Sequence, residues 1–142
     1  MLLDYVIVAE GVGQDSRGAM TLVAVDQVAL IAQTLPISVA RLLIVRAVEA
    51  RVGELTAGAD LSMRFQVTSP SGDTVAAGSV TGKGGERVLP DIPVAIQVIL
   101  QVQFQAPEVG EYRVAVTLSP STGSEVNAET SLYVVSPPGS ES

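Results

Sequence analysis

The clearest pattern along the chain is a strict alternation of apolar and polar residues over positions 61–68, "LSMRFQVT". Successive side chains of a β-strand point to opposite faces, so a period of two predicts a strand with one buried face. The next residues, "SPSGD" at 69–73, are of the types that form tight turns. The expected buried residues are Leu61, Met63, Phe65 and Val67.

The same pattern predicts strands along most of the chain. Positions 93–105 place Val94, Ile96, Val98, Leu100, Val102 and Phe104 on the inner face and glutamines on the outer face. The segment 107–120 has a turn at Val109–Gly110, followed by Tyr112, Val114, Val116 and Leu118 on the inner face. Further strands are predicted over residues 3–9, 19–25, 74–80 and 126–135.

Two segments in the first half are harder to interpret. Residues 37–54 would suit a helix by length and alanine content, but their β-branched residues favour a long strand. Residues 26–36 can hold a helical turn, which Pro36 would end. Residues 10–18 are expected to form a loop.

Seven or eight strands, with turn signals about every ten residues, are typical of an antiparallel immunoglobulin-like β-sandwich. A chain of 142 residues is long enough for one such domain. We therefore expect an all-β domain over residues 1–135. The tail 136–142 loses all periodicity and is expected to be flexible.

Charge and composition limit the partners. The net charge of −7, with no basic stripe, argues against nucleic acid as a partner. No run approaches the roughly 20 apolar residues of a membrane helix. Cysteine is absent, which is compatible with a reducing compartment. These features predict a cytoplasmic protein without a membrane span.

Charged residues make up only 16% of the chain, whereas about 25% is usual. In addition, the segments 5–9, 41–48 and 97–102 have apolar residues at consecutive positions, so both faces of these strands are apolar. A second layer must then cover the outer faces, and we expect a homo-oligomer or a protein partner. Irregular burial at the corners of the sheets is the alternative. The candidate interface residues are Leu42, Ile44, Val98, Ile99 and Leu100.

The only lysine, Lys83, lies in a glycine-rich stretch, "GSVTGKGGE". A phosphate-binding loop needs the spacing G-x-x-x-x-G-K-[ST] before a helix. Here Ala77 replaces the first glycine, Gly84 replaces the hydroxyl residue, and two prolines follow. The stretch is interpreted as a turn, and no cofactor is expected.

Catalytic chemistry has few candidates in this chain. Histidine and cysteine are both absent, which removes the usual general base and thiolate as well as the usual zinc ligands. A carboxylate-type hydrolase, built on Glu54 with Asp60 or Glu86 with Asp91, is the remaining enzymatic possibility. Carbohydrate binding would depend on the three tyrosines, Tyr5, Tyr112 and Tyr133.

The acidic loops give an alternative function. If the strands alternate in direction, the loops at 10–18, 50–60, 81–93 and 119–125 share one end of the sandwich. Carboxylates from several loops are how modules of this shape bind calcium. Basic residues in the same loops, among them Arg51 and Arg87, would instead neutralise the carboxylates. The candidate ligands of calcium or another hard cation are Glu54, Asp60, Glu86 and Asp91.

Several segments occur in one order: "LDYVIVAEG", "GAMTLVAVD", "LP" at 35–36, Glu54 before "LSMRFQVTSPSGD", and "PEVGEYRVAVTL". In this order they resemble a family of small bacterial β-sandwich proteins, common in actinobacteria and known only as a domain of unknown function. The resemblance covers about residues 2–135, and residues 26–33 depart from it. It implies the fold, and it implies no activity and no site residues.

The sequence therefore predicts a non-catalytic interaction or structural module that associates with itself. A ligand-binding module using the acidic loops is the alternative.

Overall fold

The computed structural model describes residues 1–9, 11–14, 20–23, 29–54, 60–83, 90–121 and 125–138. This part of the chain contains ten strands and no helix, so it has no helix able to cross a membrane. The strands are β1 (Leu2–Ala9), β2 (Gly11–Gln14), β3 (Met20–Val23), β4 (Ala29–Ile31), β5 (Ile37–Val48), β6 (Asp60–Thr68), β7 (Thr74–Lys83), β8 (Ala95–Ala106), β9 (Gly110–Pro120) and β10 (Val126–Val135).

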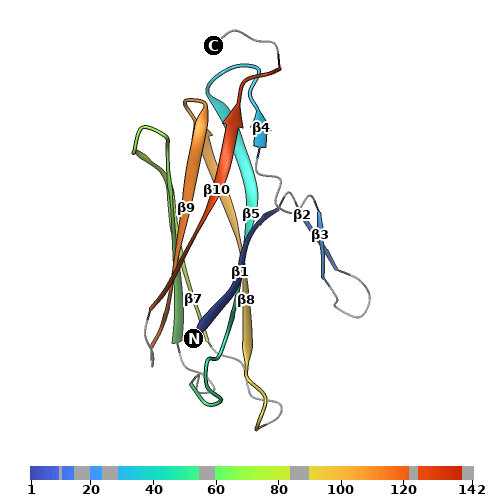
Figure 1. The fold of residues 1–142 in the computed structure, drawn as a ribbon, viewed down its shortest axis with the longest axis vertical. Coiled ribbons are helices and arrows are strands. Elements are labelled where there is room, and N and C mark those ends of the chain that lie inside the picture. Colours follow the sequence, from blue (N-terminus) through green and yellow to red (C-terminus); the bar gives the residue numbers. More distant parts are fainter. Residues whose placement is uncertain are drawn as a thin grey trace.

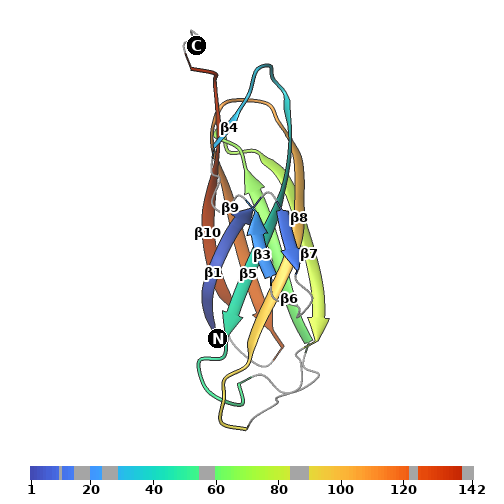
Figure 2. The same cartoon turned by 90° about the vertical axis from the view of Figure 1, so that its right-hand side faces the viewer.

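Eight of these strands form two sheets that face each other (Figure 1). One sheet has three antiparallel strands in the order β1-β5-β8. The other has five strands in the order β4-β10-β9-β6-β7, and β4 is parallel to β10 while the other pairs are antiparallel. The remaining two strands pair with each other as a β2-β3 hairpin, which stands beside the three-stranded sheet (Figures 1 and 2).

The core fills the space between the two sheets, because each strand turns every second side chain toward the other sheet. In β6 the residues Leu61, Met63 and Val67 are buried, and Phe65 packs against them from a partly buried position. In β9 all four predicted residues are buried, which confirms the alternation. These four are Tyr112, Val114, Val116 and Leu118.

The start of β9 is anchored by Tyr112, which is fully buried. Its hydroxyl donates a hydrogen bond to the carbonyl oxygen of Glu108 at 2.7 Å, and the N–H of Glu108 donates back to the phenolic oxygen at 3.3 Å. Burial raises the pKa of the Tyr112 hydroxyl above its usual value. The ring also packs against Phe104 of the facing sheet, with the two ring centroids 5.5 Å apart. The hydrogen bonds fix the turn that leads into β9, and the ring contact joins the two sheets at this corner.

Most of the predicted strands are confirmed. The ambiguous segment 37–54 contains a strand, β5, that runs over Ile37–Val48, so the long strand was the right choice. The turn at 69–73 is present, with Gly72 at a φ of +92° and its N–H bonded to the carbonyl of Ser69. Seven or eight sandwich strands were predicted, and the two sheets contain eight.

Two predictions for the first half were wrong. Residues 10–18 were expected to form a loop, but β2 lies within them at Gly11–Gln14. A helical turn was considered possible within residues 26–36, but in the described part, from residue 29 on, β4 occupies Ala29–Ile31 and a cis peptide bond joins Leu35 to Pro36. Both strands are only three or four residues long, too short for a period of two to identify.

Candidate functional site

The outer face of the three-stranded sheet carries one level of purely apolar residues. Opposite residues of an antiparallel pair share a face of the sheet. Ile44 of β5 lies opposite Ile7 of β1 and opposite Ile99 of β8. These three residues, called here the isoleucine row, therefore cross all three strands at one level of the outer face.

Solvent reaches the isoleucine row unequally. Ile44, at its centre, is completely buried, although it does not belong to the core between the sheets. Ile7 is half-buried, and Ile99 on the edge strand is 42% exposed. Leu42, which neighbours Ile44 on the same face of β5, is half-buried. Of the isoleucine row, Ile99 on the edge strand β8 therefore offers the most apolar surface to solvent.

Polar residues flank the isoleucine row on this face. At the next level, Gln97 donates a hydrogen bond to the Tyr5 hydroxyl at 2.9 Å. The Arg46 guanidinium lies beside it, with its Nε 3.0 Å from a carboxylate oxygen of Asp4. On the other side β8 continues with three exposed glutamines: Gln101, Gln103 and Gln105. An apolar strip with polar borders is the usual layout of a protein contact surface.

The outer face of the five-stranded sheet is different in character. Arg64 pairs with Glu125 at 3.4 Å, and Arg113 lies 3.5 Å from Glu111 and 3.8 Å from Glu129. A shallow hollow of about 510 Å³ lies on this face, and no large aliphatic side chain lines it. Its lining residues are Arg64, Phe65, Gln66, Ala77, Gly78, Ser79, Ala115 and Thr117. Ile31, Tyr133 and Val135 are exposed at the β4-β10 edge of this face. Among the described residues, the apolar side chains of this outer face therefore lie at an edge, whereas the three-stranded sheet has Ile44 on its central strand.

The five residues predicted for a subunit interface divide between two faces. Leu42, Ile44 and Ile99 are on the outer face, as such an interface requires. Val98 and Leu100 point inward, as the alternation over 93–105 predicts, and are partly buried against the core between the sheets, so they do not belong to the outer face. The alternation of β8 is the reason, because Ile99 points outward and both of its neighbours must then point inward.

The described parts of three of the four loops predicted to share an end do so. The N–H of Glu49 bonds to the carbonyl of Val94, and the N–H of Ser121 bonds to the carbonyl of Asp60. These bonds tie together the loops that follow β5, precede β8 and follow β9. The segment 10–18 is the exception, because β1 runs away from this end and the β2-β3 hairpin leaves beside the middle of the sheet (Figure 1).

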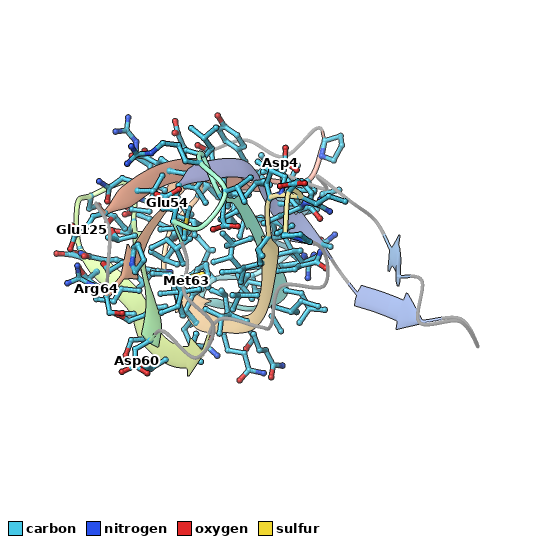
Figure 3. All side chains as sticks on the ribbon, turned by 90° about the horizontal axis from the view of Figure 1, so that it is seen from below. Asp4, Glu54, Asp60, Met63, Arg64 and Glu125 are labelled. Carbon is cyan, nitrogen blue, oxygen red and sulfur yellow. The ribbon has the colours of Figure 1, made fainter. Side chains whose placement is uncertain are left out.

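Among the described residues, the predicted cation ligands are not brought together at this shared end. Glu54 accepts hydrogen bonds from the amino group of Met1 and from the N–H of Ala50. Glu54 and Asp60 lie well apart when this end is viewed directly (Figure 3). Glu86 lies outside the described residues. Over the described ranges, including Asp91, no three acidic side chains lie close enough together to hold a metal ion.

The contact with the amino group changes the acidity of Glu54. The hydrogen bond from the Met1 ammonium is the largest cause lowering the pKa of Glu54, and the Ala50 N–H adds to it, while burial acts in the opposite direction. The Glu54 side chain is 14% exposed. This carboxylate therefore joins the start of the chain to the loop after β5.

The remaining candidates from the sequence are the glycine-rich stretch around Lys83 and the three tyrosines. β7 continues to Lys83, and the glycine-rich residues 84–89 after it lie outside the described residues. Of the tyrosines considered for carbohydrate binding, Tyr112 is buried in the core and Tyr5 is bonded to Gln97, whereas Tyr133 is 39% exposed. These three tyrosines do not share one surface platform.

Sequence reasoning missed Ile7 and the alignment that creates the isoleucine row. The alignment depends on the register of three strands that are separated by tens of residues. The available signal was an isoleucine at an outward position in each of three strands.

No protein-family model matches the chain, and no curated protein matches it. The resemblance to a bacterial β-sandwich family therefore stays a prediction.

Proposed function

We propose that this protein is a non-catalytic interaction module with an immunoglobulin-like fold, and that it associates with itself through the isoleucine row. The observation that carries this proposal is the contrast between the outer faces. The three-stranded sheet has an apolar level that crosses all of its strands, whereas the five-stranded sheet carries ion pairs and polar side chains except at its β4-β10 edge, where Ile31, Tyr133 and Val135 are exposed.

Two features support the immunoglobulin-like part of the proposal. The first strand, β1, belongs to one sheet, whereas β4, which follows it after the hairpin, runs parallel to the last strand of the other sheet. In addition, Tyr112 near the start of the penultimate strand bonds to a carbonyl four residues upstream. A tyrosine in this position, bonded in this way, is a hallmark of immunoglobulin-like sandwiches.

The distribution of charge indicates where on the surface a second copy can bind. Each copy carries a net charge of −7, so most of its surface repels another copy. The outer residues of β8 are uncharged along the whole strand, Ala95–Ala106. Two copies can approach there without placing charged side chains of β8 opposite each other, and burial of Ile99 and its neighbours would favour the contact by about 25 cal/mol for each Å² of apolar surface.

The experiment is sedimentation or light scattering at micromolar concentrations with Ile99→Lys. A lysine in the row would have to be desolvated on association, so we expect the mass to fall from that of an oligomer to that of a monomer. Gln105→Lys is the matched control, because it adds the same charge to the same strand and face far from the row. The proposal fails if the wild-type protein is a monomer, or if Ile99→Lys leaves its mass unchanged.

A further inference from the structure

The described sheet edges differ in how well they are protected against pairing with another strand. Natural proteins protect edges with charges, bulges or shortness. β1 has an irregularity in register between Leu3 and Tyr5, with the charged Asp4 at that point. β4 has only three residues. β7 has an irregularity opposite Val67 and Thr68. Each of these three edges therefore has one of the usual protections.

β8 has none of these protections. Its twelve residues, Ala95–Ala106, include no charge and no proline. All twelve pair with β5 without a shift in register, and no described strand pairs with the other side of β8. The backbone groups on that side are thus arranged in a long, regular row that can accept another strand.

The inner face of β8 is also incompletely covered. Ile96, Val98 and Leu100 point toward the core but are only partly buried. Farther along the same strand, Val102 and Phe104 are buried. The first half of β8 therefore leaves apolar surface accessible on both faces, since Ile99 is exposed on the outer one.

We propose that β8 pairs antiparallel with β8 of a second copy, on a two-fold axis through Ile99, to form a continuous six-stranded sheet. This inference rests on the proposed self-association and specifies its geometry. Ile99 would face its own copy in the partner, so the two isoleucine rows would join into one row across six strands.

The sequence of β8 matches itself in this register. In an antiparallel pair centred on Ile99, Gln97 of one copy lies opposite Gln101 of the other, so amide faces amide. On the inner face, Val98 lies opposite Leu100, and Ile96 lies opposite Val102. Polar residues therefore meet polar residues, and apolar residues meet apolar residues.

Neighbouring registers are less well matched. Opposite residues must share a face, so the axis can move only in steps of one residue along β8. A two-fold axis through Leu100 would place Ile99 opposite Gln101 of the partner. An axis through Gln101 would place it opposite Gln103 of the partner. In both cases the joined row is lost. Of these three registers, only the one that places Ile99 opposite Ile99 of the partner keeps the joined row.

Cysteine cross-linking tests this geometry directly, because the chain contains no cysteine. Residues opposite each other in an antiparallel pair have Cα atoms about 4.5–5.5 Å apart, which is within the reach of a disulfide. We expect Ile99→Cys to form a covalent dimer under mild oxidation. In Gln101→Cys, the matched control, the two cysteines would be about 14 Å apart along the strands, and no dimer should form.

A mixture of two variants checks the register. Gln97→Cys and Gln101→Cys proteins should cross-link to each other, whereas neither should cross-link to itself. If the cross-links form in Gln101→Cys alone, or in no variant of a protein that light scattering shows to be oligomeric, the β8 pairing is wrong while self-association stands. If the wild-type protein is a monomer, both proposals fail.

A charge-swap series provides a second test that does not depend on oxidation. Gln97→Lys with Gln101→Lys would place lysines opposite each other twice, and we expect the dissociation constant to rise at least about fivefold. Gln97→Glu with Gln101→Lys would create two opposite-charge pairs and should stay within about threefold of the wild type. Equal weakening in both double variants would overturn the pairing. If the copies met by stacking the outer faces of their sheets, residues 97 and 101 would not lie opposite each other, and opposite charges there would give no advantage over like charges.

Discussion

The hydroxyl of Tyr112 lies 2.7 Å from the carbonyl oxygen of Glu108, and the N–H of Glu108 returns a hydrogen bond to the same hydroxyl. The ring carrying that hydroxyl is completely buried. One side chain thus satisfies two backbone groups of the turn that leads into β9. A buried backbone group without a partner is costly, so this contact bears directly on stability.

We predict that Tyr112→Phe lowers the free energy of unfolding by about 1–2 kcal/mol, because the ring stays in place while both hydrogen bonds are lost. Urea denaturation followed by circular dichroism measures this change. Tyr133→Phe serves as the control, since Tyr133 is 39% exposed and its hydroxyl can be hydrated. Equal losses in the two variants would show that the bonds to Glu108 contribute nothing specific.

Gly78 and Gly82 of β7 provide a matched pair for a test of packing. A Cβ atom at Gly78 would lie 2.6 Å from Cε1 of Phe65, whereas one at Gly82 would meet nothing within 4 Å. Gly78→Ala must therefore displace a ring that packs against the core. We expect Gly78→Ala to be less stable than Gly82→Ala by about 1–2 kcal/mol in thermal or urea unfolding. Identical stabilities would mean that the Phe65 ring moves at no cost.

Acid should weaken the contact between Glu54 and the amino group of Met1. The folded protein holds the pKa of Glu54 below its ordinary value of 4.5, so the unfolded chain takes up the proton first as the pH falls. The stabilisation is present above about pH 4.5 and is lost as the pH falls through the lower pKa of the folded state. We expect Glu54→Gln to cost about 1–2 kcal/mol near neutral pH and to reduce the loss of stability in acid.

The measurement is the free energy of unfolding from pH 7 to pH 3 for both proteins. Glu129→Gln is the control, because Glu129 is exposed and its partner Arg113 is 3.8 Å away, a geometry that contributes little. If the curves of wild type and Glu54→Gln stay parallel over this range, then Glu54 does not account for the acid sensitivity.

The alternation of apolar and polar residues predicted the strands that have one buried face. In β6 and β9 it identified the inward-facing residues correctly, although Phe65 of β6 is only partly buried. In β5 both faces are apolar, so the pattern indicated a strand but did not say which residues face outward. Only the register with β1 and β8 resolves this, by placing Ile44 between Ile7 and Ile99.

The parts that the sequence did not predict depend on long-range pairing. The three residues of β4 are a strand because they lie beside Tyr133, Val134 and Val135, about a hundred positions away. The acidic residues were grouped by loop order alone, which says which end of the sandwich a loop occupies. It does not say where on that end each carboxylate lies, and Glu54 and Asp60 lie apart.

The chain enters the sandwich at one end and leaves it at the other: β1 begins near the loop after β5, and β10 ends beside β4 (Figure 1). A force that pulled these two ends apart would act along the strands. It would load the hydrogen bonds of β1 with β5 and of β4 with β10 in shear, together rather than in succession. Separation of the two ends along this direction would therefore require several hydrogen bonds to break at the same time.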